Sequence, residues 1–212
     1  FSKFKHKIEY WQISNFPEDI NNWERENFQR NFILNGLSEA NQEDYVIISD
    51  IDEIPNLEDV DLIVKSKKKY TAFKQKMIYY KLNLLNLTEK EWYGSRMCKL
   101  KHLKSPQWLR NKKVKLYPFY RFDKINWNIV NNGGWHFSNI MTPYDISEKI
   151  KSFAHSEFNT PEFTNIENIK EKIRLKKDLF GRKFELEKIT QEEDLPKYIN
   201  ENQKKFSEFL LK

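Results

Sequence analysis

Along the first half of the chain, segments with the apolar pattern of a strand and segments with the apolar pattern of a helix follow one another. A short apolar run over 45–48, rich in β-branched residues, predicts a buried strand, and an earlier strand is expected over 7–13. Apolar residues at helical spacing predict a helix over 18–37. A second helix is expected after Asn56, which can cap it. This order of elements is typical of an α/β fold.

Beyond residue 70 the pattern changes to short apolar stretches separated by polar loops. Further strands are expected over 71–76, 77–84 and 113–122. The pair Gly133-Gly134 predicts a turn that needs positive φ or a close approach of two backbones, since the chain has only five glycines. A capping box over 164–167 and Pro196 predict the starts of two later helices.

Length and composition fit one such domain. The 212 residues are 39% hydrophobic and 15% aromatic, which is enough to bury a core. We expect a core over 1–160 and a helical C-terminal segment over 161–212 that packs on the same domain. The single Cys98 excludes an internal disulfide framework and a cysteine-based zinc site. No stretch reaches the roughly 18 apolar residues of a transmembrane segment.

The net charge of +6 raises the question of a polyanionic partner. The basic clusters at 67–69 and 112–113 are short, and the other lysines are scattered. We therefore predict no nucleic-acid partner. A basic RNA-binding protein is the weakest alternative, and it predicts affinity that falls steeply with salt.

The most informative run is Ser49-Asp50-Ile51-Asp52-Glu53-Ile54-Pro55, directly after the buried strand. In an extended segment Asp50 and Asp52 point to the same side, where two carboxylates repel each other unless a cation meets them. Mg²⁺ or Mn²⁺, which prefer oxygen ligands, would remove that conflict. The alternative is an acidic cluster at a helix N-terminus, although Asn56 already offers the cap.

Two later stretches contain histidines. His136 lies in Gly133-Gly134-Trp135-His136-Phe137-Ser138, where it is either a ligand or a hydrogen-bonded core residue. His155 and Glu157 share a face if their stretch is extended, and the alternative is an ordinary solvated segment. Nucleotide-binding glycine loops, the serine hydrolase elbow and the His-Glu-x-x-His zinc motif are all missing from the sequence.

Four stretches together, in this order, resemble glycosyltransferase family 17. They are 48–55 preceded by Arg30-Asn31, 133–138, 151–157 and 178–182. The resemblance extends over about residues 1–195. The family includes the β-1,4-mannosyl-glycoprotein N-acetylglucosaminyltransferase that adds bisecting GlcNAc.

The resemblance implies a GT-A-like fold, with a mixed, mainly parallel sheet flanked by helices and a nucleotide-sugar site at its carboxyl edge. Members of the family usually carry an opening strand and helix before the position of Phe1, so these N-terminal elements are expected to be missing. Localisation stays open: cytoplasmic for a nearly complete chain, and Golgi or membrane-associated if an N-terminal anchor is missing.

The resemblance also implies a function: a metal-dependent inverting glycosyltransferase that moves a sugar, with GlcNAc as one candidate, from a UDP-sugar to a glycan hydroxyl. Asp50 and Asp52 would hold Mn²⁺ or Mg²⁺ against the donor diphosphate. Either His155 or His136 would complete the metal shell. Either Glu53 or Glu157 would be the general base.

Residues next to the metal are expected to contact the donor. They are Asp50, Gly134 and Trp135. Trp135 and Phe137 either stack on a sugar ring or pack in the core. The alternative function is a non-catalytic carbohydrate-binding or scaffold module derived from the same fold.

Overall fold

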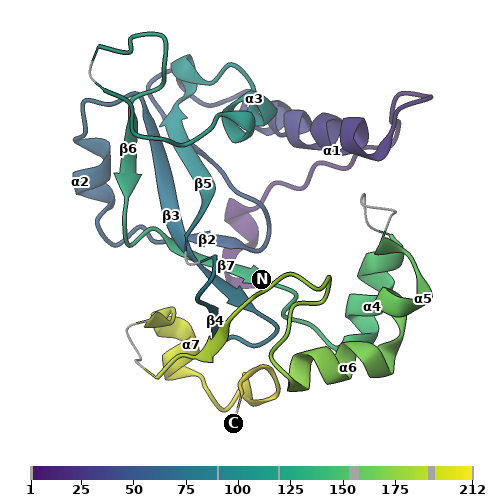
Figure 1. Ribbon diagram of the computed structural model, residues 1–212. Helices are drawn as coiled ribbons and strands as arrows, with labels where there is room; N and C mark the ends of the chain where they lie inside the picture. Colours follow the sequence, from purple (N-terminus) through teal and green to yellow (C-terminus); the bar gives the residue numbers. More distant parts are fainter. Residues whose placement is uncertain (1, 90, 119, 153–157, 191–193, 212) are drawn as a thin grey trace.

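The computed structural model describes residues 2–89, 91–118, 120–152, 158–190 and 194–211. A curled mixed sheet runs through the centre, with helices packed around it (Figure 1). The strands are β1 (Tyr45–Ile48), β2 (Glu53–Pro55), β3 (Tyr70–Tyr79), β4 (Leu84–Asn86), β5 (Trp92–Lys99), β6 (Trp127–Val130), β7 (Gly134–Ser138) and β8 (Leu186–Lys188). The α-helices are α1 (Asn22–Asn31), α2 (Val60–Val64), α3 (Pro106–Asn111), α4 (Pro143–Lys151), α5 (Pro161–Thr164), α6 (Ile166–Arg174) and α7 (Lys197–Glu201). Short 3₁₀ helices cover Ser2–Lys7, Phe32–Leu37, Leu100–His102 and Ser207–Phe209.

The long strand β3 organises the sheet. Its first half pairs with β5 and β6, and its second half pairs with β7 and β4. The sheet is extended by β1 beside β5, by β2 beside β7 and by β8 beside β4. Among the described strands, only the pairings of β3 with β6 and β7 are parallel.

The expected mixed sheet flanked by helices is therefore confirmed, and the expected mainly parallel arrangement is wrong. The reason lies in the connections. Only a few residues join β3 to β4, which allows antiparallel pairing but not a parallel crossover, and the chain then continues in the same direction to form β5 beside the first half of β3. The GT-A assignment itself stays a prediction.

Two predicted strands do not form. Residues 8–13 have no regular structure after the first 3₁₀ helix, and they pair with no described strand. The described residues between 113 and 122 form an irregular loop. An apolar pattern makes a strand only where a sheet edge is available to pair with it.

Five strands were not predicted, and several boundaries differ. The missed strands are β2, β5, β6, β7 and β8. β5 was not predicted because its buried positions include the polar Ser95 and Arg96. The two expected strands over 71–84 are instead the single strand β3 followed by β4. The helix expected over 18–37 is α1 continued by a 3₁₀ helix. The helix expected directly after Asn56 is the short α2, and the side chain of Asn165, in place of Thr164, caps α6.

The Gly133-Gly134 turn is confirmed as a point of close backbone approach. Gly134 has a φ of +113°, and a Cβ on it would lie 2.0 Å from the carbonyl oxygen of Ile54. A Cβ on Gly133 would lie 2.4 Å from the backbone nitrogen of Lys74. These glycines let the chain leave β6 and rejoin β3 as β7.

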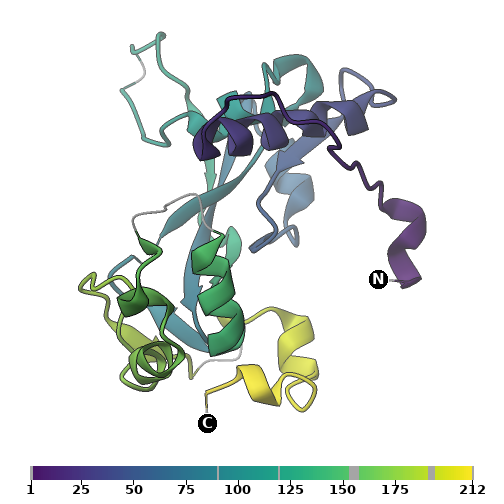
Figure 2. The ribbon, with the colours of Figure 1, turned by 90° about the vertical axis from the view of Figure 1, so that its right-hand side faces the viewer.

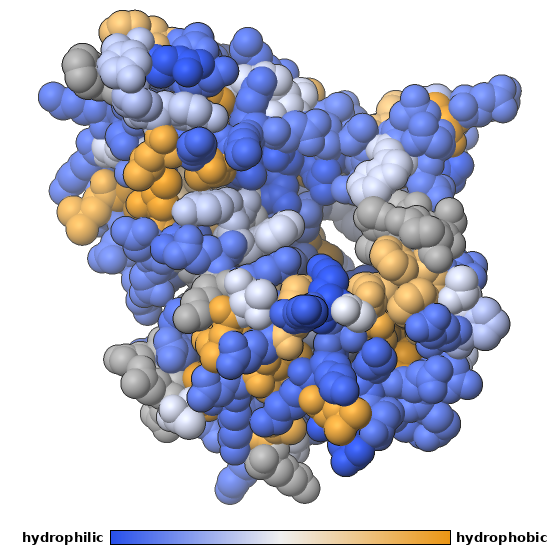
Figure 3. Space-filling model, viewed as in Figure 1, coloured by the Kyte–Doolittle hydropathy of each residue, from blue (hydrophilic) through white to orange (hydrophobic). Residues whose placement is uncertain are grey.

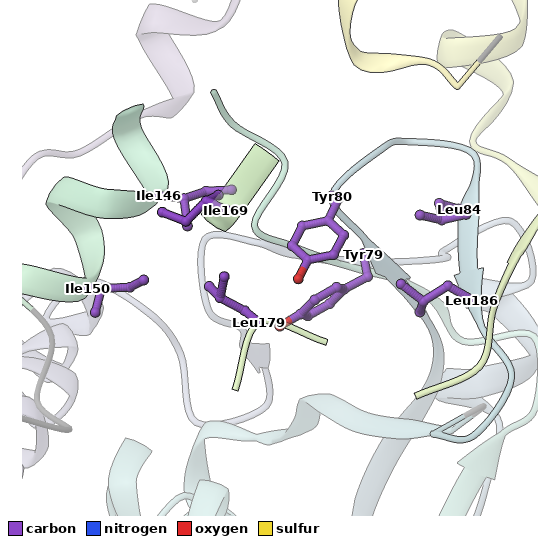
Figure 4. Close-up of a cluster of buried hydrophobic side chains, with 8 residues drawn as sticks. All are labelled: Tyr79, Tyr80, Leu84, Ile146, Ile150, Ile169, Leu179 and Leu186. Atoms are coloured by element: carbon purple, nitrogen blue, oxygen red, sulfur yellow. The ribbon is translucent and has the colours of Figure 1, made fainter. Parts of the chain in front are cut away.

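The segment after residue 160 shares the sheet and core of the segment before it. β8 pairs with β4, and Ile169, Leu179 and Leu186 bury themselves against Tyr79 and Tyr80 at the end of β3 (Figure 4). Complete burial of each such side chain stabilises the folded state by about 1.5–3 kcal/mol. The described residues of 161–212 are thus part of the structure that supports β3 and β7.

Candidate active site

The acidic run forms a tight turn between β1 and β2. The N–H of Glu53 donates to the carbonyl oxygen of Asp50 at 3.0 Å, and the N–H of Asp50 donates to the Glu53 carboxylate at 3.1 Å. Ile51, at the tip, is fully exposed. The extended geometry expected from the sequence is therefore wrong, and the carboxylates of Asp50 and Asp52 contact different partners.

Asp50 lies between two arginines. The Nη2 atom of Arg30 is 3.2 Å from Asp50 Oδ1, and that of Arg110 is 2.8 Å from Asp50 Oδ2. Arg30 is held on α1 by Glu26 and by Gln107 of α3. The Asp50 side chain is 37% exposed, so its charge is matched by protein cations while one side faces solvent.

Glu53 is buried, with its side chain only 1% exposed. Its carboxylate accepts hydrogen bonds from Arg110 at 2.9 and 3.0 Å and from the indole N–H of Trp92 at 2.7 Å. Gly94 makes room for it, because a Cβ there would lie 2.5 Å from the carboxylate. A carboxylate enclosed in this way holds the turn and Arg110 in place. These contacts do not favour Glu53 as the general base, which stays a prediction.

Asp52 faces His136. The Nε2 atom of His136 lies 3.3 Å from Asp52 Oδ2. The pairing of β2 with β7 fixes this approach, and the N–H of Phe137 donates to the carbonyl oxygen of Asp52 at 2.8 Å. The ring of Trp92 stacks on the imidazole, with the ring centroids 5.0 Å apart. Two segments about 80 residues apart in sequence are thus brought together as the sequence predicted.

Trp135 and Phe137 point away from this pair. Side chains alternate along β7, so the neighbours of His136 lie on the opposite face of the strand. The indole N–H of Trp135 donates to the carbonyl oxygen of Asp194 at 2.7 Å, and both rings pack against the cluster around Ile78. Core packing, the alternative to sugar stacking, is the arrangement that the structure shows. Gly134 approaches the backbone of β2.

The stretch that contains His155 and Glu157 lies outside the described residues. Their expected roles as metal ligand and base therefore stay predictions. The helix before this stretch, α4, is described and ends at Lys151.

A large cavity adjoins Asp50. It has a volume of about 970 Å³, and Asp50 and Arg30 form part of its wall. The N-terminal segment contributes Tyr10, Trp11 and Phe16. Binding sites for small molecules usually have 300–1,000 Å³ and aromatic walls. This cavity was not predicted from the sequence, because part of its wall comes from an N-terminal segment that was expected to be a strand.

A second cavity of about 390 Å³ lies where the parallel strands β3 and β7 end. Its polar wall contains Tyr79, Asn139, Lys149 and Arg182. Open α/β sheets bind ligands at the carboxyl ends of such strands. Four of its lining residues, Ser138, Leu179, Phe180 and Arg182, belong to stretches that the sequence analysis singled out.

Comparison with protein families identifies the class of protein to which this chain belongs. A family model described as Glycosyltransferase family 17 matches residues 1–212. The chain belongs to glycosyltransferase family 17. Searches of curated proteins and of solved structures return no match. As a glycosyltransferase, the chain has a sugar donor and a sugar acceptor as partners.

None of the helices in the described parts of this glycosyltransferase is long and apolar enough to cross a membrane.

Asp52 and His136 are two side chains in this glycosyltransferase that could hold a divalent cation. Within the described ranges, no group of three or more His, Cys, Asp and Glu side chains is placed to hold a metal ion. Asp52 and His136 present an oxygen and a nitrogen 3.3 Å apart. Adjacent ligands of an octahedral ion with bonds of about 2.1 Å lie roughly 3 Å apart, so this pair fits the ion. Asp50 does not extend the pair, because its oxygens face Arg30 and Arg110.

The Asp52–His136 contact predicts a dependence of stability on pH. Burial alone would raise the pKa of Asp52, but the hydrogen bond and charge of His136, with Lys149 nearby, hold this pKa below its ordinary value of 3.8. A carboxylate with a lowered pKa stabilises the folded state above its unfolded pKa, and this contribution is lost as the pH falls through the folded pKa. We expect urea midpoints measured between pH 6 and pH 3 to fall more for the wild type than for Asp52→Asn. If the urea midpoints of the wild type and of Asp52→Asn fall equally with pH, the Asp52–His136 contact does not stabilise the fold in this way.

Proposed function

We propose that this glycosyltransferase moves a sugar from a UDP-sugar to a glycan hydroxyl with inversion, using Mn²⁺ or Mg²⁺ held by Asp52 and His136. The Asp52–His136 pair is the observation that carries this proposal. Ions of this type keep several waters and take only one or two protein carboxylates, with substrate phosphates as further ligands. A site with two protein ligands is thus sufficient. GlcNAc is the sugar that we propose to test first.

The large cavity beside Asp50 is the proposed place for the nucleoside part of the donor. Its volume of about 970 Å³ suits a nucleotide-sugar, and Tyr10 and Trp11 offer flat rings next to it. Asp50, turned toward Arg30 and Arg110, keeps both guanidinium groups at this edge. In this proposal Asp50 positions the arginines and does not bind the metal.

Charge neutralisation is the main chemical task when a nucleoside diphosphate leaves. The bound metal supplies a Lewis acid for the diphosphate. Lys149 lies near enough to Asp52 to contribute to its lowered pKa, and its Nζ donates to Asn139 at 3.2 Å. We assign Lys149 as a second positive charge for the leaving group. Fixed charges that are already in place need no reorganisation during the reaction.

The acceptor hydroxyl must lose a proton as it attacks from the side opposite the leaving group. Glu53 is enclosed by Arg110 and Trp92, so we assign this step to Glu157. The assignment of Glu157 rests on the sequence stretch alone.

Calorimetry with UDP tests the proposed donor site. We expect UDP to bind in the presence of Mn²⁺ and to bind at least about 10-fold more weakly without it or in Asp52→Ala. The matched control is Asp61→Ala, an exposed carboxylate on α2. Equal binding with and without Mn²⁺, or unchanged affinity in Asp52→Ala, would overturn the metal role. UDP binding without any transfer or donor hydrolysis would favour the non-catalytic module.

A further inference from the structure

One end of the sheet gathers lysines from three separate segments. The strand register places the start of β1, the end of β5 and the starts of β3 and β6 at this end, since Tyr45 lies opposite Lys99 and Tyr70 opposite both Cys98 and Trp127. We call it the basic end. Its cations are Lys67, Lys68, Lys69, Lys99, Lys101, Lys104, Lys113, Lys115, Arg121 and Lys124.

Ion pairs offset only part of this charge. Glu43 pairs with Lys99 and Lys101, and Asp123 pairs with Arg121 and Lys124. In the sequence these lysines appeared scattered, but the fold brings them to one end. The basic end therefore carries a local excess of positive charge.

A loop projects from the basic end and carries exposed apolar side chains. It follows α3 and returns to β6, and it extends away from the sheet in both views (Figures 1 and 2). At its base, Val114 and Ile125 pack against the core. Further out, Leu116 is 68% exposed and Phe122 is 91% exposed. Apolar and strongly hydrophilic side chains lie side by side in this part of the space-filling view (Figure 3).

We propose that the basic end docks on an anionic membrane surface, with Leu116 and Phe122 inserted at the level of the lipid headgroups. Clustered lysines and arginines are attracted by anionic lipids, and apolar side chains beside them enter the interface. Aromatic rings are also favoured at this depth. Charge complementarity and the exposed apolar tip together identify this partner.

A nucleic acid would also be attracted by the positive charge of the basic end, but the shape of this end does not suit it. Proteins that bind single strands use a basic groove with aromatic rings on which bases stack. Here Leu116 and Phe122 stand on a projecting loop, and side chains that are 68% and 91% exposed do not line a groove. Docking at this end also leaves the proposed donor site accessible, because Asp50 follows the opposite end of β1.

Sedimentation of the full chain with vesicles tests this proposal. We expect binding to vesicles of phosphatidylcholine with phosphatidylserine, and at least about 10-fold weaker binding to vesicles of phosphatidylcholine alone. Added salt should weaken the binding. The double variant Leu116→Ser, Phe122→Ser should lose most of it. The control is Leu62→Ser on α2, which removes an apolar side chain that is 67% exposed but lies outside the loop.

The other outcomes contradict the proposal. It fails if the wild type does not bind anionic vesicles, or if the double variant, folded by circular dichroism, binds them as tightly as the wild type. It also fails if the chain binds an RNA oligonucleotide more tightly than the vesicles and the double variant leaves both affinities unchanged. That last result would assign the basic end to nucleic acid.

Discussion

Replacing Asp52 with Asn is expected to lower kcat for sugar transfer, on the proposed function, by about 10²- to 10³-fold. The amide keeps the size of the side chain but removes the negative charge that faces His136 at 3.3 Å. Without that charge the pair no longer offers an anionic oxygen to a cation, and the imidazole loses its acidic partner. Steady-state rates with saturating donor and Mn²⁺ measure this effect.

Two further variants make the result specific. His136→Gln should cause a loss similar to that of Asp52→Asn, and the double variant should be little worse than either single one, because groups that act as a unit are not additive. Asp61→Asn, on the exposed side of α2, is the matched control and should keep the wild-type rate. Full activity of Asp52→Asn would refute the assigned metal pair.

Replacing Arg110 with Ala is expected to destabilise the fold by about 3–5 kcal/mol. The variant leaves the carboxylate of Glu53, whose side chain is only 1% exposed, without its cation. Breaking a buried pair by removing one partner is costly because the remaining charge stays buried. Urea unfolding followed by circular dichroism gives the free energy of unfolding.

A second replacement separates loss of charge from loss of packing. The double variant Glu53→Gln, Arg110→Met removes both charges, and we expect it to recover much of the stability that Arg110→Ala loses. Arg174→Ala breaks the exposed pair with Glu171 and should leave the unfolding midpoint unchanged. If Arg110→Ala proves as stable as Arg174→Ala, then Glu53 is not held as a buried anion.

The acidic run and the Gly-Gly turn before His136 could be singled out from the sequence because their signals are local. Carboxylates directly after a buried strand and a Gly-Gly pair before His136 are unusual whatever the rest of the chain does. Arg110 and Trp92 carry no such signal. They reach Glu53 from 57 and 39 residues away, so only the folded sheet shows that they surround it.

The direction of the strands was predicted wrongly for a related reason. The alternation of apolar and polar residues shows that a segment is a strand, but not which neighbour it pairs with. β5 illustrates this, since its buried Arg96 is stabilised by the carbonyl oxygens of Leu109, Arg110 and Lys112, all from a later segment. Without β5, the central strand β3 has no antiparallel partner at its first half, and a parallel sheet is the natural expectation.

The pairing of β4 with β8 has a consequence for how the chain is made. It places Leu85 opposite Glu187. During translation, β4 therefore leaves the ribosome long before its partner strand β8 is made. During synthesis the surface around Tyr79 and Tyr80 is not fully covered until Leu186 has emerged. Contacts this distant in sequence slow folding and prolong the exposure of apolar surface. This half of the sheet is therefore completed last, while the half built on β1, β5 and β6 can form earlier.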